Sequence, residues 1–248
     1  MAFPQVEATN TSSQDSNVLN HTVSLPAGIQ AGETLLVFFA NNADSGGVGW
    51  PGGWNEIFET VEPGNQVTLA VAWRKATGGE GGTITVTTGN GRQSAHASYR
   101  ISGAIDPAVT APEVSTGATG VGTNPNPDSL TAGGGSDEYL WIAVEGNDTN
   151  LTVSAYPTNY DSNQLSLVSG AGAGNCGIGV ASDEVETNTQ DPGTFTISGS
   201  EQWVACTVAV YPAVVGWAGG DVLGVAIAGI AKINGVALAD IIKVNGVA

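Results

Sequence analysis

The chain has 248 residues, of which 36 are glycine and 12% are charged, and its formal net charge at pH 7 is −17. So acidic a chain lacks the basic surface that attracts nucleic acids and anionic membranes, so neither is expected as a partner. Abundant glycine and sparse charge suit short strands joined by turns and argue against long helices.

The first half of the chain alternates short apolar stretches with turn signals. Residues 1–20 are a polar lead-in with one expected strand near Val6. Further strands are predicted at 21–25, 34–40, 55–61, 66–74, 83–88 and 95–102. Glycine, proline and asparagine separate them, as in Gly89-Asn-Gly91 between the last two. Regular short strands with such turns are typical of a β-sandwich.

The same pattern restarts in the second half. Ser24-Leu-Pro-Ala-Gly28, before the strand at 34–40, resembles Ser129-Leu-Thr-Ala-Gly133, before a strand that contains 138–143. Each half then ends with a strand rich in glycine and threonine and a closing strand, the later pair at 193–197 and 203–210. We therefore predict an all-β, jelly-roll-like β-sandwich body over residues 1–213, with similar halves of about 1–105 and 106–213. Two tandem sandwiches are the alternative.

Cys176 and Cys206 are the only cysteines, and each shares a strand face with apolar neighbours by period-two alternation. Two buried thiols are expected, with a disulfide between neighbouring strands as the alternative. Two cysteines without suitably spaced histidines do not make a zinc site. No metal or cofactor is predicted.

A short C-terminal tail, residues 214–248, contains an 11-residue repeat. Residues 227–237 read IAGIAKINGVA and residues 238–248 read LADIIKVNGVA, with seven identical columns. So short a repeat cannot bury its own apolar side chains and needs copies or a partner to stack on. The predicted assembly interface consists of Trp217, Val222, Leu223, Val225, Ile227, Ile230, Ile233, Val236, Leu238, Ile241, Ile242, Val244 and Val247.

The backbone of this tail admits two predictions. Asn234-Gly235 and Asn245-Gly246 suit either tight turns between short strands or the C-terminal ends of short helices. Strands are favoured, and the choice stays open. The longest apolar run, residues 222–231, is about half a membrane span, and Lys232 interrupts its extension, so no membrane span is expected.

Catalytic motifs are weak. Asp44-Ser-Gly-Gly47 resembles the nucleophile loop of chymotrypsin-like proteases, but Ala43 replaces the expected glycine, and neither His21 nor His96 has a matching context. Acidic clusters at 56–59 and 183–186 lack a motif that separates an acid from a base. We therefore predict that the protein is not an enzyme.

Trp50 and Trp54 flank Pro51-Gly-Gly53 in a predicted loop. Aromatic side chains beside such a loop can stack on a sugar ring or fill a partner's pocket. The pair is a candidate contact for a host-surface glycan, although a place for Trp54 over the sandwich core is the plainer interpretation. A carbohydrate-binding adhesin for host attachment is accordingly the alternative function.

Several segments together resemble structural proteins of tailed bacteriophages. These are Leu25-Pro-Ala-Gly-Ile-Gln-Ala-Gly-Glu33, Ala72-Trp-Arg-Lys-Ala-Thr77, residues 201–210 and the Asn-Gly-Val-Ala endings of the tail repeat. The resemblance implies a non-enzymatic component of the virion exterior, either a capsid decoration protein or a fibre. Its partners would be other virion proteins and further copies of itself, in a homo-oligomer for which a trimer is one option. The resemblance supplies no catalytic residues.

Overall fold

Antiparallel β-strands form the regular secondary structure of the residues that the computed structural model describes, which are 2–43, 46–172, 174–213, 232–233 and 236–237. Residues 1–213 form one unit and residues 214–248 a second. Within the described residues, no helix has the length and apolarity needed to cross a membrane.

The first half of the chain forms one sheet with the strand order β1-β6-β2-β5-β4, and β3 pairs with β6. These strands are β1 (Gln5–Ser24), β2 (Thr34–Asn42), β3 (Val48–Gly49), β4 (Asn55–Val61), β5 (Val67–Lys75) and β6 (Thr83–Ser102). The second half forms a sheet with the order β12-β13-β10-β16-β7, and β8 pairs with β16. Its strands are β7 (Glu113–Val114), β8 (Ala118–Gly122), β10 (Asp137–Asp148), β12 (Ser162–Val168), β13 (Cys176–Thr187) and β16 (Glu201–Val210).

Three two-stranded sheets complete the structure. β9 (Leu130–Thr131) pairs with β14 (Thr189–Gln190), β11 (Val153–Ala155) with β15 (Thr196–Ile197), and β17 (Lys232–Ile233) with β18 (Val236–Ala237).

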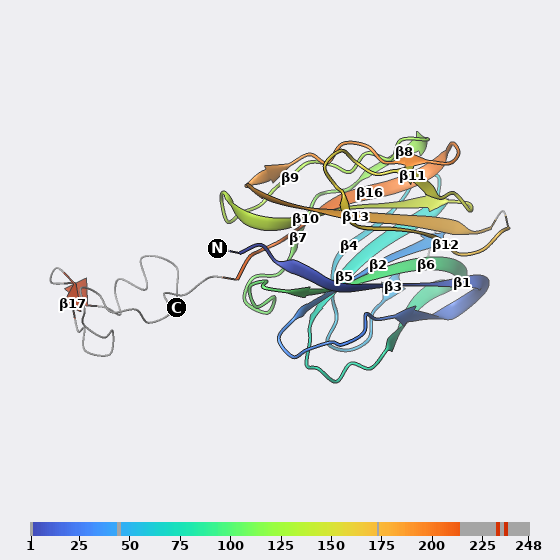
Figure 1. Ribbon diagram of the computed structural model, residues 1–248. Helices are drawn as coiled ribbons and strands as arrows, with labels where there is room; N and C mark the ends of the chain where they lie inside the picture. Colours follow the sequence, from blue (N-terminus) through green and yellow to red (C-terminus); the bar gives the residue numbers. More distant parts are fainter. Residues whose placement is uncertain (1, 44–45, 173, 214–231, 234–235, 238–248) are drawn as a thin grey trace. The chain divides into compact units, whose positions relative to one another are not determined.

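The two large sheets lie face to face, the strands of the second half above those of the first in Figure 1. They have equivalent orders, because β2 lies between β6 and β5 as β10 lies between β16 and β13. Across the sandwich β2 contacts β10, β6 contacts β13, and β5 contacts β16. The predicted β-sandwich of two similar halves is therefore confirmed. Its jelly-roll connectivity is not, since each half supplies one whole sheet.

Apolar side chains fill three layers instead of one. On β2, Leu36, Phe38 and Ala40 point between the sheets, where the largest core lies. Their neighbours Leu35, Val37 and Phe39 belong to a smaller core on the outer face of the first sheet. A third core covers the outer face of the second sheet and includes Trp141, Tyr160 and Phe195. Because both faces of β2 are covered, its sequence is a continuous apolar run without the alternation of polar and apolar residues.

A folded two-stranded ribbon provides the cover on the first sheet. β1 and β6 are 20 residues long each and pair along their length, with register shifts between Gln14 and Asn20. At these shifts the ribbon folds back onto itself. Two hydrogen bonds show this: the Ser24 N–H donates to Ser12 Oγ at 2.9 Å, and Ser98 Oγ donates to the Ser24 carbonyl at 2.8 Å. The part beyond the fold, residues 20–24 paired with residues 83–87, is called the distal ribbon below.

This ribbon corrects two sequence predictions. Residues 1–20 are not a lead-in, because β1 begins at Gln5 and runs through to Ser24. The Gly89-Asn-Gly91 segment does not separate two strands, because β6 passes through it. The missing side chain of Gly89 instead allows close approach of another backbone: an added Cβ would lie 2.4 Å from the Gly46 carbonyl oxygen. Glycine inside a strand commonly marks such a bulge.

Candidate functional site

Most of the predicted assembly interface lies outside the described residues. This holds for Trp217, Val222, Leu223, Val225, Ile227, Ile230, Leu238, Ile241, Ile242, Val244 and Val247. Ile233 and Val236 face each other in the antiparallel pair β17–β18, next to the pair Lys232 and Ala237. Two positions, Asn234 and Gly235, separate the two strands in the chain. In this repeat copy the backbone follows the strand alternative.

The two candidate tryptophans differ in exposure. Trp54 is 8% exposed and belongs to the smaller core of the first sheet, while Trp50 packs against this core and is half-buried. The two indoles stack with centroids 6.2 Å apart. Trp50 Nε1 donates to Glu56 Oε2 at 2.7 Å. Any contact with a glycan by this pair therefore falls mainly to Trp50.

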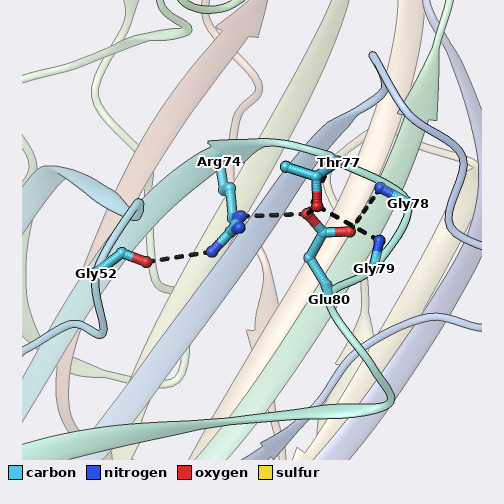
Figure 2. A network of polar contacts seen from close by, with 6 residues as sticks. All are labelled: Gly52, Arg74, Thr77, Gly78, Gly79 and Glu80. Atoms are coloured by element: carbon cyan, nitrogen blue, oxygen red, sulfur yellow. Dashed lines mark hydrogen bonds and ion pairs between the residues drawn. The ribbon is translucent and has the colours of Figure 1, made fainter.

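A carboxylate clasp holds the loop that follows β5 (Figure 2). Glu80 accepts hydrogen bonds from the Thr77 N–H at 2.6 Å, the Thr77 hydroxyl at 2.7 Å and the Gly78 N–H at 3.0 Å. Arg74 Nε lies 3.3 Å from Glu80 Oε1, and Arg74 Nη1 donates to the Gly52 carbonyl at 3.1 Å. Burial raises the pKa of Glu80, but the Thr77 hydrogen bonds and Arg74 outweigh it, so the net pKa is lowered.

A surface pocket of about 500 Å³ lies beside this clasp. It is lined by Asn10, Leu25, Pro26, Ala27, Gly28, Ile29, Gly78, Glu80, Gly81 and Gly82. Its two polar side chains already bind the fold, since Asn10 Nδ2 donates to the Leu25 carbonyl and Glu80 belongs to the clasp. The pocket walls thus present mainly backbone and apolar groups.

Both histidines are fully buried, His21 on the distal ribbon and His96 on the sheet beneath it. Desolvation lowers the pKa of His21 to about 4, and desolvation followed by the charge of His21 lowers that of His96 to about 3. Ser94 Oγ lies 2.6 Å from His21 Nδ1 and 2.7 Å from His96 Nε2. Both side chains are thus bound within the fold. Asp44 and Ser45 of the protease-like loop lie outside the described residues.

The prediction of two buried thiols is confirmed, since Cys176 and Cys206 are free and 0% exposed. Desolvation raises the pKa of Cys176 to about 12 and raises that of Cys206 further still. Because the thiolate is the reactive form, both thiols are inert near neutral pH. Among the described residues, no three histidine, cysteine or acidic side chains converge on a position for a metal ion.

A buried carboxyl group, Glu145 on β10, was missed by the sequence analysis. Both of its oxygens accept from Asn147 Nδ2, at 3.1 and 3.0 Å. Burial raises the pKa of Glu145 to about 7, against a lowering by the Asn147 hydrogen bond. Gly179 on the neighbouring strand makes room, since an added Cβ would lie 2.7 Å from Glu145 Oε1. The available signal was alternation, because Glu145 follows Trp141 and Ala143 on the same covered face.

We expect Glu145→Gln to remove one contribution to the pH dependence of stability, which lowers the stability of the natural chain as pH rises from about 4.5 to 7. The folded state keeps a proton up to pH of about 7, whereas the unfolded state releases it near the ordinary pKa of 4.5. The contribution of Glu145 to stability therefore falls with rising pH across this window, by about 3 kcal/mol at roughly 1.4 kcal/mol per pH unit. The buried histidines contribute equally to both proteins, so the difference between the natural chain and Glu145→Gln isolates this carboxyl group. Urea unfolding of both proteins at pH 5 and pH 8 measures the difference.

The exposed Glu186 on β13 provides the control, because Glu186→Gln removes a carboxyl of the same strand pair without changing a buried group. Parallel pH profiles for the natural chain and Glu145→Gln would contradict the assignment.

Comparisons with protein-family models, characterised proteins and solved structures found no match.

Proposed function

We propose that the chain is a non-enzymatic structural protein of a virus particle of the tailed-bacteriophage type, exposed on the virion exterior as a capsid decoration or fibre. Its partners in this proposal are other virion proteins and further copies of itself. The supporting observation is the contrast between the two parts of the chain. The acidic β-sandwich keeps its histidine and cysteine side chains buried, while the tail carries an apolar repeat with few charges.

The pairing in the tail supplies a physical reason for assembly. β17 and β18 are two residues long each, and an isolated hairpin of that size is not stable in water. The sequence repeats the same Asn-Gly-Val-Ala ending at 245–248. Each fully buried Val, Leu or Ile side chain contributes roughly 1.5–3 kcal/mol, so the apolar residues of several tails together can support a persistent interface.

Deleting residues 222–248 is expected to give a soluble, folded monomer, whereas the full chain forms a homo-oligomer. The reason is that the deletion removes the apolar repeats and leaves the sandwich, which has its own cores. Light scattering measures the mass of each protein, and circular dichroism confirms that the truncated body remains folded.

Two point variants refine this test within the repeat. Ile233→Asp should weaken the oligomer because it buries a charge, whereas Lys232→Gln, its chain neighbour, should change the mass little. A truncated protein that keeps the oligomeric mass of the full chain would refute assembly through the tail.

A further inference from the structure

One chain of hydrogen bonds, buried except at its half-buried Ser12 end, holds the folded β1–β6 ribbon together. Ser12 Oγ lies 2.9 Å from His96 Nδ1, and His96 Nε2 lies 2.7 Å from Ser94 Oγ. Ser94 Oγ lies 2.6 Å from His21 Nδ1, and His21 Nε2 lies 3.0 Å from Thr88 Oγ1. His21 is on the distal ribbon and His96 on the sheet beneath it, so the chain links the two layers.

The direction of these bonds follows from the Thr88 end. The Thr88 hydroxyl donates to the Asn90 carbonyl at 2.7 Å, so its oxygen accepts from His21 Nε2. His21 Nδ1 must then accept from the Ser94 hydroxyl. Ser94 has no second hydrogen to give, so its oxygen accepts from His96 Nε2.

The other end of the chain agrees with this direction. His96 Nδ1 accepts from the Ser12 hydroxyl, and Ser12 Oγ accepts from the Ser24 backbone N–H at 2.9 Å. Each hydroxyl thus donates once and accepts once. Both imidazoles are neutral, with their proton on Nε2. Each imidazole nitrogen and each hydroxyl of this series of hydrogen bonds has a partner. Such a fully satisfied buried network is stabilising and specific.

A second proton on either imidazole breaks this arrangement. Imidazolium donates from both nitrogens, so Nδ1–H of His21 would meet the hydrogen of the Ser94 hydroxyl. The Phe39 ring, which offers no hydrogen-bond acceptor atom, stacks on His96 and meets His21 edge-on, with centroids 5.0 and 5.2 Å away. A buried charge without a counter-ion is costly, which is why desolvation leads the causes of both lowered pKa values.

Within the described part of the chain, no carboxylate contributes to the pKa shifts of the two histidines. Asp15 and Arg92 lie at the fold of the ribbon, and neither is among the causes of the shift of His21 or His96. Among the described residues, the charge of His21 is the one that contributes to the shift of His96, and it opposes protonation further. Relief requires water, and both imidazoles are 0% exposed while the ribbon lies on the sheet.

We propose that the distal ribbon is an acid-released flap, which covers the outer face of the first sheet while His21 and His96 are neutral and lifts when they take up protons. Lifting uncovers the smaller core, in which Val23 and Val86 of the ribbon pack on Leu35, Val37 and Phe39 of β2. A histidine whose pKa is lower in the closed form than in the open form stabilises the closed form fully above a pH of about 6.5. This contribution is lost as pH falls. The opening constant therefore rises about tenfold per histidine for each pH unit, from about 6.5 to about 4.

Hydrogen–deuterium exchange on the full chain at pH 7.5 and pH 4.5, corrected for the intrinsic exchange rate, tests this flap. Amides of residues 20–24 and 83–87 should lose protection at least a hundredfold on acidification, while β10 and β13 keep theirs. Equal loss in the flap and in the second sheet, or no loss in either, would overturn the proposal.

Variants connect the opening to the two histidines. In a His21→Gln, His96→Gln double variant the flap's exchange should no longer depend on pH, and acid opening equal to that of the natural chain would refute the proposal. Glu145→Gln, in the opposite sheet, should leave acid opening unchanged. If the double variant does not fold, NMR titration of the natural chain provides the test. An imidazole that titrates near pH 6.5 while the flap stays protected would contradict the proposal.

Discussion

Phe38→Ala should destabilise the sandwich by about 3–5 kcal/mol, the usual cost of truncating a buried phenylalanine. Phe38 is 0% exposed and lies in the core between the two sheets, where its ring meets Tyr99 edge-on at 5.4 Å. A cavity there removes contacts from both halves of the chain at once. Urea unfolding should therefore show a lower midpoint for the whole body in a single transition.

The next residue of the same strand offers a matched control. Phe39 is also 0% exposed, but it belongs to the smaller core beneath the distal ribbon. Phe39→Ala should loosen the ribbon before the rest of the sandwich, so hydrogen exchange should speed up first in residues 20–24 and 83–87. Indistinguishable exchange patterns for the two variants would show that the layers do not separate in this way.

The sequence predicts the sandwich well because the covered strands are strongly apolar. The predicted strand at 55–61 coincides with β4, and those at 34–40 and 66–74 fall within one or two residues of β2 and β5. The resemblance between the halves also corresponds to a real equivalence, since each half forms one sheet with the same strand order. Short-range patterns suffice here because burial on one or both faces leaves a direct mark on composition.

Folding of the ribbon could not be predicted from the same patterns. Residues 5–18 are polar because β1 lies at the edge of its sheet, so their alternation is weak although they form a strand. Gly89 carries a turn signal, but its role is a close backbone approach inside β6. Whether a glycine turns a chain or bends a strand depends on what packs against it, and local sequence does not contain that information.

Buried polar groups were the other omission. The sequence offers His21 and His96 only as catalytic bases without a matching context and does not single out Glu145, yet all three side chains are 0% exposed. Their burial depends on distant partners: His96 bonds Ser12, which lies 84 positions away, and Glu145 occupies space left by Gly179. Of the predicted interface, only the backbone pairing of Ile233 with Val236 falls in the described residues, so the assembly role rests on the proposed experiments.

Gly177→Ala, in strand β13, is the second substitution with a large expected effect. An added Cβ at Gly177 would lie 2.4 Å from the Leu151 carbonyl oxygen and 2.7 Å from Asn147 Oδ1. The first of these is a backbone atom, which cannot rotate away as a flexible side chain can. Gly177→Ala is therefore expected to cost about 1–3 kcal/mol through overpacking.

The matched control is Gly82→Ala, where an added Cβ meets nothing within 4 Å and the backbone does not require glycine. That variant should be neutral or about 0.4–1 kcal/mol more stable, because alanine restricts the unfolded chain. Thermal unfolding of both variants measures the contrast. Equal stability of the two would mean that the loop at Leu151 yields to a methyl group. In that case the space around Asn147 and Glu145 would be less constrained than their burial implies, and the difference in pH profile between the natural chain and Glu145→Gln should then shrink as well.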